Sequence, residues 1–281
     1  MYKVFLFVLV IFLLFFQSCV SLNEVHNYAT TSVEALNKID DIDYTFSDYC
    51  WRDCELQQLR TGEIKPDFTC GCSGAATSAD EALRKIRLTV TTYLIAVASL
   101  SNNKAFSYDV SDLTEAVQKG RLLNLDEKQV AVSTKAGNFI AAAATTFYRK
   151  KKLKQYLGEA DTLFQRLTET LVYLVDNRLR AQLKFEYDAR LANAKQMLDN
   201  TNDRAVKQMV VKSYIDEKAY YNKHNALIDA YVNLLKSVQK GYHGLYTQRY
   251  KLNVASTKNL IKNYSQDLQD LAGSINNKSK K

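Results

Sequence analysis

Four cysteines in two close pairs are the residues of this chain whose type and spacing are best suited to chemistry. The first pair is Cys50-x3-Cys54 and the second is Cys70-x-Cys72. As thiolates, four such sulfurs can hold Zn²⁺ or Cu(I), and as oxidised pairs they can form two disulfides. No Met-rich or His-rich stretch lies near them, and neither a C-x-x-C thioredoxin motif nor a C-x-x-C-H haem-attachment motif is present. Two structural disulfides are the favoured interpretation, with a metal site and a redox role as alternatives.

The sequence alone leaves three ways to pair these cysteines. A bond within the second pair would close a strained small ring, which favours links between the two pairs. The nested arrangement, Cys50 with Cys72 and Cys54 with Cys70, suits a chain that turns back at Gly62 or Pro66. Each bridge would contribute about 3 kcal/mol if it acts by restricting the unfolded chain.

The N-terminus carries the remaining cysteine. Lys3 precedes an uncharged apolar run from Val4 to Phe16, and Gln17-Ser18-Cys19 follows it. The run is well short of the ~20 residues that a membrane-spanning helix needs. The pattern resembles the signal peptide and lipobox of bacterial lipoproteins, although Phe16 and Gln17 stand where that class commonly has Leu and a small residue.

That resemblance implies that residues 1–18 are removed and that Cys19 carries diacylglycerol and a further acyl chain such as palmitate. The mature chain would then be anchored in a membrane without spanning it. Val20 replaces the Asp that often retains such proteins at the inner membrane, so the expected location is the outer membrane, facing the periplasm. An oxidising periplasm in turn favours disulfides over a metal site at the paired cysteines.

Long helices are the expected fold. Pro occurs once, Gly occurs nine times, and no sustained strand-like alternation is present. Apolar residues recur every three or four positions in coiled-coil-like seams, as from Leu83 to Leu100 and from Leu157 to Leu174. We expect residues 19–281 to form one all-α domain, an elongated antiparallel bundle of four or five long helices. Within it, residues 43–76 would be a Cys-rich irregular segment, residues 77–275 the long helices and residues 276–281 a polar tail.

Helix starts and one turn are also indicated. The sequences from Ser21 to Glu24 and from Ser78 to Glu81 fit capping boxes. Residues 199–202 are typical of a turn, and Asp203 is placed to cap the helix that follows.

No arrangement of residues indicates an enzyme. His26, His224 and His243 have no metal-ligand spacing, and His224 lies on an apolar seam, where a hydrogen-bonded interior histidine is the simpler interpretation. The chain contains no G-x-S-x-G, P-loop or dinucleotide-binding motif. We therefore expect no catalytic residue, no metal and no cofactor apart from the lipid.

Two surfaces are candidates for binding a partner or lipid. The formal net charge is +8, and losing Lys3 leaves about +7. In an envelope protein this suggests anionic lipid, polysaccharide or an acidic protein rather than nucleic acid. The candidate residues are the basic run Arg149, Lys150, Lys151, Lys152 and Lys154, and the tyrosines Tyr214, Tyr221, Tyr242 and Tyr246. The alternatives are a solvated helix end for the lysines and core positions for the tyrosines.

The sequence thus predicts a lipid-anchored envelope protein that acts by binding, as a scaffold or adaptor for another envelope component. A small-ligand or metal-binding module is the alternative, as is a toxin-neutralising lipoprotein of the immunity type.

Overall fold

The computed structural model describes residues 22–62, 69–101 and 149–279, and every regular element in these ranges is helical. Cys19 and Ser21, and the predictions that rest on them, lie outside the described residues. The expected all-α, elongated bundle is confirmed. Its elements are α2 (Asn23–Leu36), the 3₁₀ helix η1 (Asn37–Ile42), α3 (Phe46–Thr61), α4 (Ala75–Ser101), α7 (Arg149–Tyr173), the π-helical turn η4 (Leu174–Leu179), α8 (Arg180–Asn200), α9 (Arg204–Thr247) and α10 (Ala255–Ser279).

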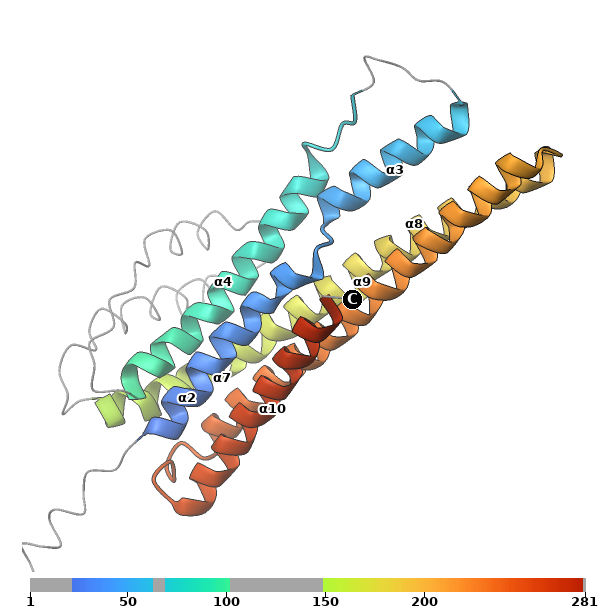
Figure 1. The fold of residues 1–281 in the computed structure, drawn as a ribbon. Coiled ribbons are helices and arrows are strands. Elements are labelled where there is room, and N and C mark those ends of the chain that lie inside the picture. Colours follow the sequence, from blue (N-terminus) through green and yellow to red (C-terminus); the bar gives the residue numbers. More distant parts are fainter. Residues whose placement is uncertain (1–21, 63–68, 102–148, 280–281) are drawn as a thin grey trace, which may run out of the picture.

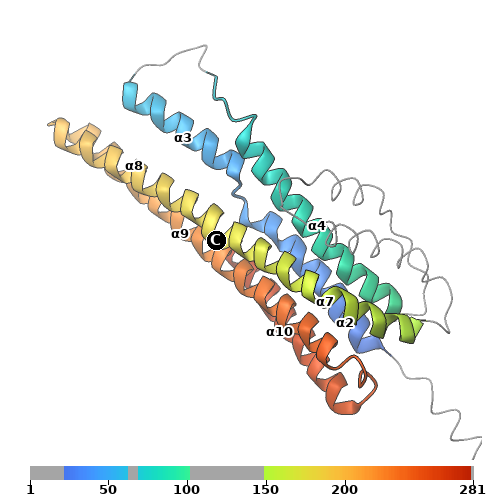
Figure 2. The ribbon, with the colours of Figure 1, turned by 180° about the vertical axis from the view of Figure 1, so that it is seen from behind.

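The helices run up and down along one long axis (Figures 1 and 2). One end of the molecule, here called the base, holds the starts of α2, α7 and α10 and the ends of α4 and α9. At the other end, the tip, α8 and α9 form a hairpin that extends beyond the other helices, with α3 beside it. The 44 residues of α9 cover about 66 Å, and they connect tip and base.

One hydrophobic core runs along the described part of the bundle, and tyrosines are among its largest fully buried side chains. The hydroxyl of Tyr28 donates to the carbonyl oxygen of Val238 at 2.5 Å, and that of Tyr231 donates to Leu36 at 2.9 Å. At Gly241 a Cβ would overlap the ring of Tyr28. This glycine therefore lets α2 approach α9 closely and does not interrupt the helix.

The Cys-rich segment is more regular than expected. Residues 46–61, which we predicted to be irregular, form α3. A capping box between Thr45 and Asp48 begins this helix, and Asp80 of α4 accepts further hydrogen bonds from the amides of Phe46 and Ser47 at 2.8 and 3.0 Å. The start of α3 is thus held partly by a residue from another helix, which local sequence does not reveal.

Two other boundaries also differ. The predicted cap at Ser78 is wrong, because α4 already begins at Ala75 and the Ser78 hydroxyl donates to the carbonyl of Gly74. Helix α10 continues to Ser279, so most of the expected polar tail is helical. The Asp203 cap is confirmed, since its carboxylate accepts from the amides of Ala205 and Val206.

Within the described ranges, no helix combines the length and apolar character needed to cross a membrane.

Candidate functional site

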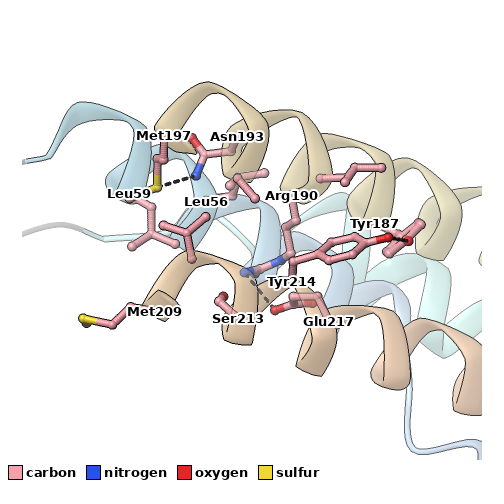
Figure 3. A pocket seen from close by; sticks show the side chains of 13 residues that line it. Leu56, Leu59, Tyr187, Arg190, Asn193, Met197, Met209, Ser213, Tyr214 and Glu217 are labelled. Carbon is pink, nitrogen blue, oxygen red and sulfur yellow. Dashed lines mark hydrogen bonds and ion pairs between the residues drawn. The ribbon is translucent and has the colours of Figure 1, made fainter. Parts of the chain in front are cut away.

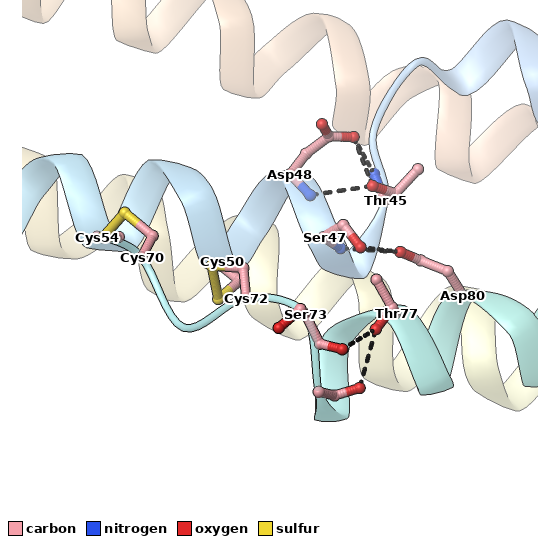
Figure 4. The surroundings of a disulfide bond; sticks show 11 residues. Thr45, Ser47, Asp48, Cys50, Cys54, Cys70, Cys72, Ser73, Thr77 and Asp80 are labelled. Carbon is pink, nitrogen blue, oxygen red and sulfur yellow. Dashed lines mark hydrogen bonds between the residues drawn. A yellow bond between two sulfur atoms is a disulfide. The ribbon is translucent and has the colours of Figure 1, made fainter. Parts of the chain in front are cut away.

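Two disulfides fasten the chain that precedes α4 along the side of α3 (Figure 4). Cys50 pairs with Cys72 and Cys54 with Cys70, with Cα–Cα distances of 5.7 and 5.9 Å. The nested pairing is confirmed. Cys50 and Cys54 are one helical turn apart, so both sulfurs leave the same face of α3. Bonded in this way the sulfurs are not thiolates and offer no metal ligands. Paired cysteines of this kind are typical of an extracytoplasmic compartment.

A cluster of charged side chains around the buried Glu186 joins α3 to the hairpin of α8 and α9. Glu186 of α8 has a side chain that is only 2% exposed, and it forms an ion pair with the Nε atom of Arg52 on α3. It also accepts from Nε of Arg190 at 3.2 Å and from the hydroxyl of Tyr44 at 3.0 Å. The carboxylate therefore has three partners, as a buried charge requires.

Glu217 of α9 completes this cluster. It lies 2.7 Å from one terminal nitrogen of Arg52 and 3.4 Å from one of Arg190. Arg190 also donates to the backbone carbonyl of Arg52 at 2.8 Å. Two guanidinium groups and two carboxylates thus connect all three helices through ion pairs.

Aromatic rings cover this cluster. The guanidinium of Arg52 lies 4.0 Å from the centre of the Tyr220 ring, which in turn lies 3.9 Å from the ring of His224. Burial raises the pKa of Tyr220 to about 12, and burial and the Glu186 charge raise the pKa of Tyr44 well above its usual range. Burial alone would lower the pKa of Arg52, but the hydrogen bond and charge of Glu186, with Glu217, raise it. His224 is buried and hydrogen-bonded to the Tyr220 carbonyl, as predicted.

An apolar groove opens beside the cluster at the tip (Figure 3). Its volume is about 250 Å³. Several of its apolar side chains face solvent, with Leu59 61% and Met209 72% exposed, and the ion pair of Arg190 and Glu217 lies along one side. The lining residues are Leu56 and Leu59 from α3, Tyr187, Arg190, Leu191, Asn193, Ala194 and Met197 from α8, and Met209, Val210, Ser213, Tyr214 and Glu217 from α9.

Two of the predicted surface tyrosines lie at this groove or next to it. Tyr214 lines it, and its hydroxyl accepts a hydrogen bond from Tyr187 at 3.4 Å. Tyr221 stacks on Tyr187 with ring centres 4.6 Å apart. The shared hydrogen bond with Tyr214 raises the pKa of Tyr187 to about 12.

The prediction for Tyr242 is wrong. This residue is fully buried and stacks on Phe164 with ring centres 3.8 Å apart. It follows Tyr231 and Val238 by eleven and four residues, so it continues the buried stripe of α9.

The remaining predicted residues lie at the base, far from the groove. Tyr246 is half-buried near the end of α9. Lys151 is exposed and Lys152 and Lys154 are half-buried in the first turns of α7, while the side chains of Arg149 and Lys150 lie outside the description. The structure therefore separates the predicted binding residues into two groups at opposite ends of the molecule (Figure 1).

Sequence reasoning missed the ion-pair cluster and most of the groove. Glu186 and Arg190 are one helical turn apart, which by itself looks like a solvent-exposed pair. A signal for the groove was present in Leu191, Met197 and Met209, apolar residues near the end of the hairpin that are 39%, 45% and 72% exposed.

Among the described residues, no three His, Cys, Asp or Glu side chains are grouped so as to hold a metal ion. No protein-family model, curated protein or solved structure matches the chain.

Proposed function

We propose that this chain is a lipid-anchored bacterial envelope protein that binds a partner protein through the groove at its tip. Cys19 carries the anchor, and the partner inserts an apolar helical segment between α3, α8 and α9. The observation that carries this proposal is a groove with solvent-facing Leu and Met side chains at the opposite end of the bundle from the first residue of α2.

The size of the groove favours a protein segment over a small ligand. Pockets for drug-sized molecules commonly have volumes of about 300–1,000 Å³ and enclose most of the ligand. This groove has about 250 Å³ and is partly open to solvent, with its walls on three helices. Amphipathic helices bind in shallow apolar grooves of this kind, and methionines such as Met197 and Met209 adapt readily to the side chains of a partner.

The walls of the groove are fixed before any partner arrives. Two disulfides and the cluster around Glu186 hold α3, which supplies Leu56 and Leu59. A preformed groove avoids the free-energy cost of ordering its own walls on binding. The ion pair of Arg190 and Glu217 offers polar atoms along one side, where it would fix the register of the partner segment.

The lipid anchor is tested by Cys19→Ala. We expect this variant to leave the membrane fraction, and mass spectrometry of the native N-terminal peptide to show acylated Cys19 after loss of residues 1–18. Native protein that begins elsewhere or carries no acyl chain would contradict the anchor, whatever the groove binds.

The groove is tested with a matched pair of variants. Met209→Glu places a charge in the groove, and Ile215→Glu places one at a residue of α9 that is 58% exposed and does not line it. Both sites are exposed, so neither change should cost much stability. After cross-linking in native membranes, the Met209→Glu variant should lose a partner that the native and Ile215→Glu proteins retain. A partner set unaffected by Met209→Glu would contradict the proposal.

A further inference from the structure

We propose that the base of the bundle is a docking surface for anionic phospholipid headgroups, a role that rests on the lipid anchor proposed above. The surface, here called the basic face, comprises the first turns of α7 and the turn between α9 and α10. Its described residues are Lys151, Lys152, Lys154, Arg249, Tyr250 and Lys251.

The fold brings these two stretches together. Lys154 of α7 lies with its ammonium 5.9 Å from the centre of the Tyr250 ring, just after the end of α9. The guanidinium of Arg249 lies 4.7 Å from that ring and 4.2 Å from the ring of Tyr246. Tyr250 is 69% exposed. Cations thus surround an exposed aromatic ring, a combination that suits the boundary between headgroups and water.

Among the described residues of this face, all charged side chains are basic. Residues 149–158 and 246–258 contain eight Lys or Arg and no Asp or Glu. Residues 184–218 at the tip contain seven basic and six acidic residues, and lysines such as Lys184 and Lys212 pair there with Asp188 and Asp216. A helix surface whose charges serve only for solvation would carry similar numbers of basic and acidic residues, as the tip does. The excess at the base instead complements a negative surface.

The anchor would place this face against the bilayer. Only residues 20–22 separate Cys19 from the first residue of α2, so the chain between them spans at most about 14 Å. Since α2 begins at the base, the acyl chains hold this end near the headgroups. Val254 is 45% exposed in the α9–α10 turn and adds an apolar contact for the interface. In this orientation the long axis leads away from the bilayer and carries the groove with it.

The interaction can be measured without the anchor. A chain of residues 20–281 keeps every contact described here, because all described residues lie between 22 and 279. We would measure its sedimentation with vesicles of phosphatidylcholine alone and with phosphatidylglycerol added, at low and high salt. The test variant is Lys151→Gln/Lys154→Gln/Lys251→Gln. The control is Lys195→Gln/Lys207→Gln/Lys218→Gln, which removes the same charge from exposed positions near the tip.

We expect the chain to bind only vesicles that contain phosphatidylglycerol, and to bind them more weakly at high salt. In the test variant the affinity for these vesicles should fall on the order of 100-fold, because each basic residue near the surface contributes roughly a factor of five. The control should stay within about threefold of the native chain. Equal losses in both variants, equal binding to phosphatidylcholine, or tighter binding to a soluble acidic polysaccharide than to the vesicles would each overturn the proposal. Because this chain carries no acyl group, such a result is distinguishable from a failure of the Cys19 anchor.

Discussion

Removing the carboxylate of Glu186 should destabilise the tip far more than its position on a hairpin suggests. In Glu186→Ala, Arg52 and Arg190 lose the more buried of the two carboxylates that they share, although their own side chains are only 22% and 11% exposed. Tyr44 also loses the acceptor of its hydroxyl. Breaking a buried ion pair from one side costs about 3–5 kcal/mol. Because Glu217 still neutralises one guanidinium, we expect Glu186→Ala to lower the free energy of unfolding by about 3 kcal/mol, at the lower end of that range.

Glu55 provides the matched control. It approaches the same Arg190 at 3.5 Å, but its side chain is 63% exposed. Exposed pairs contribute about 0–1 kcal/mol, so Glu55→Ala should be nearly neutral. Urea unfolding of both variants with the disulfides intact gives the two free energies of unfolding. Hydrogen exchange should also show faster exchange of the α3 amides in Glu186→Ala alone. If the two variants differ by less than about 1 kcal/mol, the cluster does not hold α3 as described.

Four further predictions concern the core, one of the disulfides and the ionisation of Tyr220. Tyr28→Phe should lower the free energy of unfolding in urea by about 1 kcal/mol, because its hydroxyl donates to Val238. Tyr242→Phe should be neutral or stabilising, because its buried hydroxyl has no hydrogen-bond partner among the described residues. Gly244→Ala should lower the melting temperature by an amount equivalent to about 1–3 kcal/mol, because the new Cβ would lie 2.7 Å from the Tyr264 ring; an unchanged melting temperature would contradict this. Cys54→Ala/Cys70→Ala should lower the free energy of unfolding in urea by about 3 kcal/mol. A loss of less than about 1 kcal/mol would show that this bridge does not stabilise the fold. Alkali should destabilise the fold. The folded pKa of Tyr220, about 12, exceeds its ordinary value of 10.0, so the stabilisation linked to its protonated hydroxyl is complete below pH 10 and is lost as the pH rises to about 12; phenolate absorbance and circular dichroism can follow this together.

The sequence was sufficient to predict the helices that carry their own apolar seam. Leu83, Ile86, Val90 and Tyr93 repeat at helical spacing, and all four are buried in α4. The links between the two cysteine pairs were also expected, because a ring within the second pair would be strained. The nested order was favoured because the chain between the pairs can turn back, and the structure decides it. In both cases the deciding residues lie close together in the sequence.

Helix α3 could not be predicted in the same way, because contacts from distant parts of the chain hold it. Only Phe46 and Leu56 are buried within it, and Trp51 is 51% exposed, so it shows no clear apolar seam. Its N-terminus is held by Asp80 in addition to its own capping box, and its inner face is fixed by Glu186 from another helix. Charged residues are usually exposed, so nothing local marks Glu186 as buried. The groove depends on the position of α3 and was missed for the same reason.

The groove is tested most directly by photo-crosslinking in native membranes. A photoreactive residue would replace Met209, and in a second protein it would replace Ile215. We predict that one envelope protein cross-links at position 209, at a segment with an apolar helical face, and does not cross-link at position 215. The same products at both positions, or none at position 209, would contradict the claim that the groove is where this protein binds its partner.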